Sequence, residues 1–457
     1  LARDRLGIKP VYFRETDKSF YFSSHMAPLI SVEGKTGKLD FESLHFYMTL
    51  HSIVPAPRTL VKDVKKLEPA HYIKVIGGRI VEKQRYWSVS DSELLDFPQM
   101  SDTDWKDRIL SILRKSVERR LVADVPVGVF LSGGLDSSLV TALIREQNPG
   151  DLKTFSIGFR GINKEDGNEF KYSRIIAEKY ATDHHEISVS TQELLEHLPE
   201  ALRVHSEPMV SHDNVGFYLL SRFSSEMAKV VQSGQGADEV FAGYHWYPTL
   251  KESKNVVSDY CKLFFDYPYE ELTKHTRKEF FKQNYCLDFV ESYFGDFNKS
   301  TPLWKAMHLD THVMLVEDPV KRVDNNTMAW GLEARVPFLD HELVEAASHL
   351  PDRLKLAHEG KGILKSIGYD LLPHEVIDRP KGYFPVTELK YIQGPFLEFV
   401  KNLIDPSDAK IRSLFKGSHI NTLLGDPPAH MTPLRGSKLW QIAVLENWLQ
   451  NHKVEVQ

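Results

Sequence analysis

The residues best suited to chemistry form a glycine-rich run, Ser132 to Ser138, between a short apolar stretch and an amphipathic one. This order predicts a strand, a loop and a helix. Glycine allows close approach of the backbone, and the unpaired N–H groups of a helix N-terminus attract anions. Asp136 would repel a phosphate unless a Mg²⁺ lay between them. The run therefore predicts a Mg²⁺–nucleotide site, although Ser-Gly-Gly alone is also typical of an ordinary turn.

A second glycine turn, Ser233-Gly234-Gln235-Gly236, follows another short apolar run at 229–232. Asp238 comes directly after it, so we expect it to share a Mg²⁺ with Asp136. The alternative is a plain helix N-terminus, where acidic residues are favoured in any case. No GxxxxGK[ST] sequence occurs, which disfavours transfer of a γ-phosphate.

The elements that position these loops alternate along the middle of the chain. Strands are expected at 125–131, 154–159, 184–189 and 229–232, and helices at 104–121, 169–181, from Thr191 as N-cap, and at 213–228. This alternation predicts an α/β fold with a doubly wound parallel sheet, with ligands beyond the carboxyl ends of the strands. After about residue 245 aromatic-rich helices dominate, and we expect them to wall off an acceptor pocket.

Residues 1–87 lack the alternation of strands and helices that is expected in the middle of the chain. Short β-like runs at 11–13, 20–23, 71–76 and 79–81 surround one helical stretch, 41–50, and Gly77-Gly78 indicates a hairpin turn. The segment contains too little apolar material for a convincing independent core. Residues 88–103 are polar and are expected to form a linker, followed by one large domain at 104–457.

Composition excludes several classes of protein. The chain has 457 residues, 42% hydrophobic and 26% charged, with a net charge of −6. No basic block suggests nucleic-acid binding, and no apolar run approaches the roughly 20 residues that span a bilayer. No secretory signal is visible, and the two cysteines, Cys261 and Cys286, form no CxxC pair. A cytoplasmic protein is expected.

Three motifs in order carry a family resemblance: SGGLDSS at 132–138, SGQGADEVFAGY at 233–244 and DNNTMAWGLEARVPFLD at 324–340. They resemble the synthetase half of glutamine-dependent asparagine synthetases, an ATP pyrophosphatase with the adenine nucleotide alpha hydrolase-like fold. Residues 2–10 and 55–60 resemble the later part of that family's N-terminal nucleophile glutaminase domain. The resemblance covers nearly the whole chain and implies a glutaminase remnant at 1–87.

The resemblance implies a role for individual residues. The positions matching the ATP, pyrophosphate and Mg²⁺ site are Leu131, Ser132, Gly133, Gly134, Asp136, Ser137, Ser138, Ile157, Ser233, Gly234 and, as second Mg²⁺ ligand, Asp238. Lys381 matches a catalytic lysine, and a fixed cation near the α-phosphate would lower the barrier to adenylation. A solvated loop lysine is the alternative. Lys361 and Lys365 could receive an anionic acceptor or phosphates, but a surface role is equally open.

Two departures from the family pattern matter. Gln235 stands where asparagine synthetases carry an acid, and Gln can orient an acceptor but cannot act as a general base. This casts doubt on aspartate as the acceptor. No cysteine lies near the start of the chain, so the glutaminase nucleophile is missing. We expect an N-terminally truncated chain; direct use of free ammonia is the other explanation.

A narrower resemblance joins residues 207–214, 231–238 and 379–386 to the N-acetylglutaminylglutamine amidotransferases, which make an osmolyte. It implies an amide ligase that adenylates a small carboxylate or dipeptide acceptor and aminates it with ammonia from glutamine. A homodimer is possible, and no nucleic-acid or membrane partner is expected. The alternatives are asparagine synthetase proper, acting on aspartate, and a non-catalytic interaction protein that retains the fold.

Overall fold

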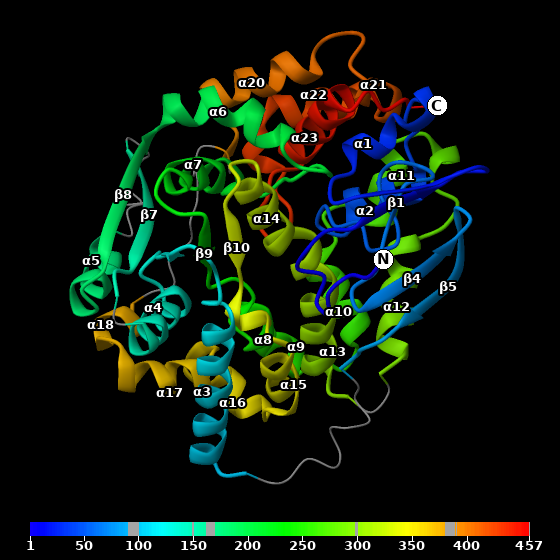
Figure 1. The fold of residues 1–457 in the computed structure, drawn as a ribbon. Helices are drawn as coiled ribbons and strands as arrows, with labels where there is room; N and C mark the ends of the chain where they lie inside the picture. The colour runs from blue at the N-terminus through cyan, green and yellow to red at the C-terminus, as the bar shows by residue number, and fades with distance from the viewer. Residues whose placement is uncertain are drawn as a thin grey trace.

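A five-stranded parallel sheet lies at the centre of the computed structural model, which describes residues 1–89, 100–148, 150–160, 170–297, 300–379, 389 and 391–456 (Figure 1). The strands run in the spatial order β10-β9-β6-β7-β8. Their bounds are β6 (Val127–Phe130), β7 (Lys153–Arg160), β8 (Asp183–Ser190), β9 (Val230–Gln232) and β10 (Glu333–Arg335). The expected parallel sheet with four strands is confirmed, and a fifth strand joins its edge.

The fifth strand, β10, was not expected. It has only three residues, two of them charged, and it lies in the part of the sequence where helical patterns dominate. The strand forms because its backbone pairs with β9, with Ala334 opposite Val231. Such pairing between distant segments leaves no periodic signal in a run this short.

The strand order fixes where a ligand can bind. Successive strands β6, β7 and β8 extend the sheet in one direction, and β9 and β10 extend it from β6 in the other. The order therefore reverses between β6 and β9, and the loops that leave two such strands diverge to opposite faces and open a crevice. Both glycine loops leave the sheet at this point.

Helices cover both faces of the sheet (Figure 1). The helices that follow β6 and β7 pack with α3 and α17 on one side, while α6, α7 and α14 pack together on the other. Their bounds are α3 (Asp102–Arg119), α4 (Leu135–Gln147), α5 (Phe170–Lys179), α6 (Thr191–Arg203), α7 (Asn214–Ser225), α14 (Lys321–Met328) and α17 (Gly362–Leu371). Ser190, not Thr191, is the N-cap of α6, because its hydroxyl accepts from the N–H of Glu193 in a capping box.

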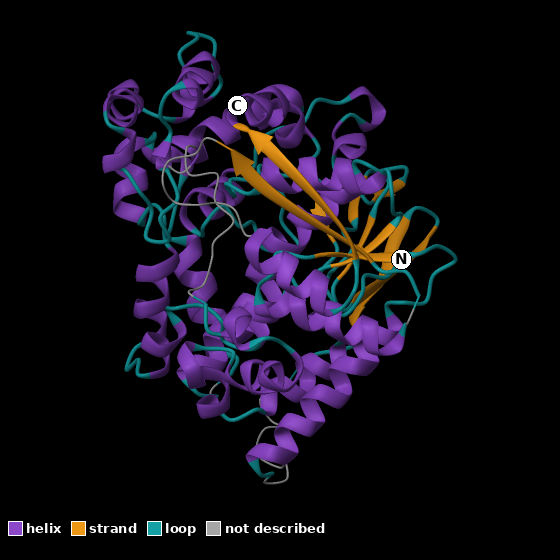
Figure 2. Cartoon of the chain, turned by 90° about the vertical axis from the view of Figure 1, so that its left-hand side faces the viewer, coloured by secondary structure: helices purple, strands orange, loops and turns teal. Residues whose placement is uncertain are grey.

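The remainder of the second half is helical, and in Figure 2 helices make up most of the body beside the grouped strands. The helices are α8 (Ala237–Val240), α9 (Tyr247–Lys251), α10 (Val256–Phe264), α11 (Tyr269–His275), α12 (Tyr285–Gly295), α13 (Pro302–Leu309), α15 (His341–His349), α16 (Asp352–Leu356), α18 (His374–Ile377), α20 (Pro395–Ile404), α21 (Ile411–Leu414), α22 (Gly417–Gly425) and α23 (Lys438–Asn451). Two π-helical turns, η4 (Asp310–Met314) and η5 (Val316–Val320), connect α13 to α14. No helix within the described ranges is long and apolar enough to cross a membrane.

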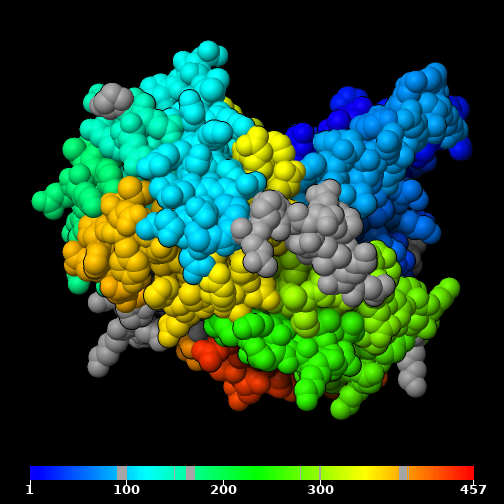
Figure 3. All heavy atoms as spheres, turned by 90° about the horizontal axis from the view of Figure 1, so that it is seen from below, coloured from blue at the N-terminus to red at the C-terminus, as the bar shows by residue number. Residues whose placement is uncertain are grey.

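The N-terminal residues form a small antiparallel sheet and a hairpin. Strands β1 (Tyr12–Glu15), β2 (Phe20–Ser23) and β3 (Lys65–Lys66) pair in the order β2-β1-β3, and β4 (His71–Ile76) pairs with β5 (Arg79–Arg85) across the expected Gly77-Gly78 turn. Helices α1 (Ala27–Ile30) and α2 (Phe41–Thr49) complete this part. It projects as a lobe in Figure 3, where it is blue.

This lobe shares its core with the C-terminal helices. Residues of α2 belong to the same buried apolar cluster as residues of α12 and α23. Tyr47 and Gln441 are linked twice, since the Tyr47 hydroxyl donates to the Gln441 carbonyl at 2.8 Å and the Gln441 side chain donates to the Tyr47 carbonyl at 2.8 Å. The N-terminal segment is thus packed firmly onto the part of the chain that carries the sheet.

Candidate functional site

The first glycine loop connects β6 to α4, with Gly134 as the N-cap of the helix. The loop is held by its own hydroxyls: the Ser132 N–H donates to the Ser137 hydroxyl oxygen at 3.2 Å, and the two hydroxyls lie 3.1 Å apart. Gly133 has φ +69°, and a Cβ there would lie 2.6 Å from the backbone carbon of Tyr172. Only glycine fits at this position, so the tight turn is built into the sequence.

The second loop leaves β9 and runs into α8. Its Gly234 packs directly on the first loop, because a Cβ at this residue would lie 2.9 Å from Cβ of Asp136 and 3.0 Å from the nitrogen of Ser137. The absent side chain therefore lets the two loops touch at the reversal point of the sheet. This close approach is what brings the two predicted motifs into one site.

A cavity of about 630 Å³ opens between the loops; we call it the cleft. Most of the predicted binding residues line it: Leu131, Ser132, Gly134, Asp136, Ser137, Ile157, Ser233, Gly234, Gln235 and Asp238. Gly133 and Ser138 are buried and do not line the cleft. The Ser138 hydroxyl has no hydrogen-bond partner among the described residues. Lys381, the predicted catalytic lysine, lies outside the described residues.

Lys361 joins the two acidic residues of the cleft. Its Nζ lies 2.6 Å from Oδ2 of Asp136 and 2.9 Å from Oδ1 of Asp238. Burial acts to lower the pKa of Lys361, but the two carboxylates outweigh it and raise that pKa above its usual value. A surface position, which the sequence left open for this lysine, is therefore wrong.

The ammonium group of Lys361 reaches both carboxylates at once, which a shared Mg²⁺ would also have to do. Within the described ranges no group of three or more His, Cys, Asp or Glu side chains converges on a metal position. Two carboxylates at the mouth of a backbone cradle fit a Mg²⁺ that takes its other ligands from phosphates and water. The donor set thus suits a nucleotide-bound Mg²⁺ better than a protein-only metal site.

Two further residues of the cleft had no assigned role in the sequence. Asp213 lines the cleft and accepts a hydrogen bond at 2.5 Å from Arg322, the second residue of α14. Arg379 also lines the cleft. One nitrogen of its guanidinium group would lie 3.3 Å from a Cβ atom added to Gly134. Both residues lie inside motifs of the narrower resemblance, Arg379 in 379–386 and Asp213 in 207–214, which was the available signal. The role of Asp213 stayed open, because its partner lies 109 residues away.

The cysteines do not supply a nucleophile. Burial raises the pKa of the Cys261 thiol to about 12, and burial raises that of Cys286 well above its usual value. A protonated thiol is a poor nucleophile. Both cysteines lie on helices of the C-terminal part, at Cys261 in α10 and Cys286 in α12.

Fold and site together define an α/β protein with a polar cleft at the reversal point of a parallel sheet. Comparison with known sequences gives the family: the asparagine synthase family model matches residues 108–450 and the glutamine amidotransferase domain model matches residues 1–87. The chain belongs to the asparagine synthetase family. This family uses ATP, and its members named below are carbon–nitrogen ligases with glutamine as amide donor.

Several curated relatives carry that name. The chain is 26% identical to asparagine synthetase [glutamine-hydrolyzing] 1 of Bacillus subtilis, over all of this chain and 75% of the relative. It is 26% identical to the rat enzyme over 89% of this chain and 64% of the relative, and 33% identical to a putative enzyme of Methanocaldococcus jannaschii over 53% of this chain and 46% of the relative. The relatives agree on the reaction family but leave the acceptor of this chain open.

Proposed function

We propose that this protein is an ATP-dependent amide ligase. An acceptor carboxylate attacks the α-phosphorus of ATP, the bond to the β-phosphate breaks, and pyrophosphate leaves. Ammonia derived from glutamine then attacks the carbonyl carbon of the acyl-adenylate, and AMP leaves with the bonding electron pair. The observation that carries the proposal is the pair of glycine loops whose acidic residues, Asp136 and Asp238, both contact the ammonium group of Lys361.

The chain's own residues would bind and orient the reactants. Backbone N–H groups at the start of α4 and the hydroxyls of Ser132 and Ser137 face the polyphosphate, as expected of an anion-binding helix N-terminus. Asp136 and Asp238 would hold Mg²⁺, which neutralises phosphate charge when it is bound. Arg379 and Lys365 add positive charge to the same cleft, and Lys381 is proposed as the cation nearest the α-phosphate.

We propose N-acetylglutaminylglutamine, or a related acylated dipeptide, as the acceptor. The support is Gln235, which lines the cleft where the asparagine synthetase pattern has an acid. An amide can donate and accept hydrogen bonds with an amide-rich acceptor, whereas the α-ammonium group of aspartate calls for a carboxylate partner. The amide thus favours an acceptor without a free amino group.

The test is acceptor-dependent formation of AMP and pyrophosphate with ammonium as nitrogen source. Aspartate and acylated glutaminyl dipeptides are compared at equal concentration, and the amide product is identified by mass. AMP with the dipeptide alone supports the full proposal, and AMP with aspartate alone supports asparagine synthesis. ADP in place of AMP contradicts the proposed reaction, and the absence of any acceptor-dependent turnover favours a non-catalytic role.

A further inference from the structure

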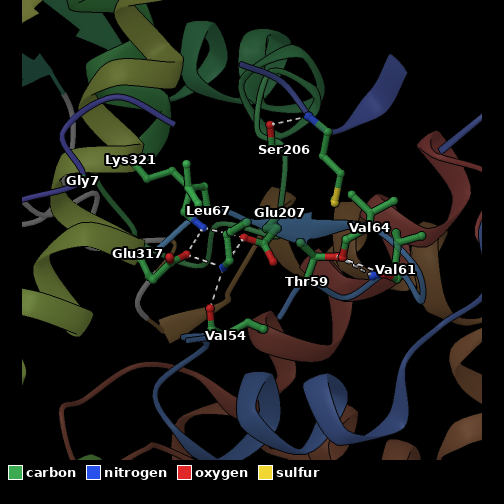
Figure 4. Close-up of polar contacts among 12 residues, drawn as sticks. Gly7, Val54, Thr59, Val61, Val64, Leu67, Ser206, Glu207, Glu317 and Lys321 are labelled. Atoms are coloured by element: carbon green, nitrogen blue, oxygen red, sulfur yellow. Dashed lines mark hydrogen bonds and ion pairs between the residues drawn. The ribbon is translucent and has the colours of Figure 1, made fainter. Parts of the chain in front are cut away.

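Four charged side chains meet inside the protein where the N-terminal segment contacts the rest of the chain. They form the quartet Lys66, Glu207, Glu317 and Lys321. Lys66 Nζ lies 2.9 Å from Oε2 of Glu207 and 2.6 Å from Oε2 of Glu317, and Lys321 Nζ lies 2.7 and 2.6 Å from the same two atoms. Figure 4 shows Glu207, Glu317 and Lys321 pointing toward one another beside the carbonyl of Val54, which also accepts a hydrogen bond from Lys66.

The quartet is balanced in charge and closed to water. Its side chains are only 2–8% exposed. Burial raises the pKa of Glu317, but Lys321 and Lys66 outweigh it and hold that pKa below its usual range. The second oxygen of Glu207, Oε1, is buried without a hydrogen-bond partner among the described residues. The position of Glu207 therefore depends on the two ammonium groups.

Glu207 lies near the start of the segment 205–214, which runs from the end of α6 to the first residue of α7 and carries Asp213 into the wall of the cleft. Helix α14 holds this segment along its length. Its first residue, Lys321, binds Glu207, and its second, Arg322, binds Asp213.

Two further side chains of α14 complete the hold on this segment. The Asn325 side-chain oxygen accepts from the backbone N–H of Ser206 at 3.2 Å, and the Asn326 side chain donates to the Asn214 side-chain oxygen at 2.8 Å. The segment is thus fixed at both ends by one helix. That helix follows the π-helical turn that supplies Glu317, and such turns are often found at functional sites.

We propose that Lys66 is a positioning residue of the cleft: from the N-terminal lobe it fixes Glu207 and, with α14, the conformation of residues 205–214 that places Asp213. This inference rests on the proposed function only in assigning the acceptor to the cleft. Lys66 thus links the N-terminal lobe to the cleft through this network of charges without touching any reactant, beside the hydrogen bond that the Met26 N–H donates to the Ser206 hydroxyl at 3.2 Å.

The physical reason lies in the charge count. Replacing Lys66 by Met leaves two buried carboxylates in contact with one ammonium group, with the guanidinium of Arg3 as a further cation that acts on Glu317. Like charges in a site of low dielectric repel strongly. Glu207 is the carboxylate whose other oxygen has no partner, so we expect it to move rather than Glu317. Residues 205–214 then lose part of their support near Glu207, where the hydrogen bonds of Asn325 and Met26 with Ser206 remain, while Arg322 still holds Asp213.

Lys65 provides a matched control, because it is the other residue of β3 and is exposed. Hydrogen exchange of the full chain is compared among wild type, Lys65→Met and Lys66→Met. We expect faster exchange at 205–214 in Lys66→Met alone. With ammonium as donor, we expect the KM for the acceptor to rise about tenfold, or about 1.4 kcal/mol, with kcat within about twofold, a split that a general loss of folded protein would not give.

The proposal fails if exchange in Lys66→Met rises equally across the chain, or if 205–214 exchanges as in Lys65→Met. Should Lys66→Met not fold, the charge-balanced variant Lys66→Met/Glu207→Gln decides, because Glu317 and Lys321 stay paired in it while the side chain at position 207 loses its charge: faster exchange at 205–214 than in wild type supports the proposal, and wild-type exchange there overturns it. Absence of AMP formation by the wild type would instead overturn the proposed function, and the exchange result would still stand.

Discussion

Two clusters of lysine and carboxylate, one at the cleft and one beneath the N-terminal lobe, use the same groups to different effect. At the cleft Asp136 and Asp238 are 21% and 23% exposed, and one lysine faces two acids. In the quartet no side chain is more than 8% exposed and two lysines face two acids. Partial exposure and an excess of negative charge leave room for an incoming cation, whereas full burial and balance leave none.

The difference shows what burial does to an ion pair. Water at the cleft can solvate a carboxylate that loses its partner, although Lys361 itself is only 9% exposed. In the quartet each charge depends on its neighbours, because removing one leaves the others desolvated and unpaired. The cleft cluster is therefore suited to binding a ligand, and the quartet to holding two parts of the chain in place.

The largest expected effect tests the cleft. Asp136→Asn keeps the size of the side chain but removes half of the negative charge proposed to hold Mg²⁺. We expect acceptor-dependent AMP formation to fall about 10³-fold, or about 4 kcal/mol, with little change in the thermal midpoint of unfolding. Asp151→Asn, an exposed position beside β7, is the control. A large loss of stability in Asp136→Asn would mean that the cleft cluster is structural, like the quartet.

The next effect tests the quartet. Glu317→Gln leaves two buried ammonium groups facing one carboxylate, and we expect the free energy of unfolding in urea to fall by about 3 kcal/mol. The control is Glu200→Gln, which breaks an exposed pair with Arg203 and should cost less than about 0.5 kcal/mol. Equal losses in both variants would show that burial does not separate the two kinds of cluster.

Local patterns predicted the parts of this site that depend on neighbouring residues. The apolar runs of β6 and β9 and the glycines after them define strand, loop and helix within a few positions, and the motif order gave the cleft. The sequence left the burial of Lys361 open because its partner Asp136 is 225 residues away, and no local spacing reports such a contact. Arg379 and Asp213 both lay in motifs of the narrower resemblance, but no local pattern gave either of them a role.

The pair Lys65 and Lys66 shows the limit most clearly. Alternation along a strand predicts that the two side chains face opposite ways. It does not say which one enters the interior, and two adjacent lysines favour neither. The structure buries Lys66 because Glu207 and Glu317, more than a hundred residues away, meet it there.

Asp310 is a buried acid whose hydrogen bonds come from neutral tyrosine hydroxyls, so it can be compared with the acids of the two clusters. Asp310 accepts hydrogen bonds from the hydroxyls of Tyr260 at 2.6 Å and Tyr247 at 2.7 Å, and burial raises its pKa to about 6 despite these bonds. Between its unfolded pKa near 3.8 and about 6, the folded state holds a proton that the unfolded state has released. Stability therefore falls as the pH rises through this window.

Asp310→Asn does not titrate, so the stability of wild type relative to this variant should fall by about 2 kcal/mol from pH 4 to pH 7. Urea unfolding at both pH values measures it, with the exposed Asp17→Asn as control. A difference that stays constant with pH would show that neutral donors suffice to keep a buried carboxylate charged, and the cations of the quartet would then need another explanation.

The smallest effect comes from an ion pair intermediate between the two clusters. Lys9 Nζ lies 2.7 Å from Oδ1 of Asp324, with the lysine 45% and the aspartate 8% exposed. This pair also joins the N-terminal lobe to α14, but water reaches one of its members. Lys9→Ala should therefore lower the free energy of unfolding at pH 7 by only about 0.5–1 kcal/mol.

Burial raises the pKa of Asp324 and Lys9 opposes that rise, so the loss in Lys9→Ala should shrink as the pH falls and Asp324 takes up a proton. Lys35→Ala, which breaks an exposed contact with Glu33 at 3.6 Å, should change stability by less than about 0.5 kcal/mol at any pH. If Lys9→Ala costs as much as Glu317→Gln, burial of a single partner is enough to fix an ion pair. The distinction between the cleft and the quartet would then depend on charge balance alone.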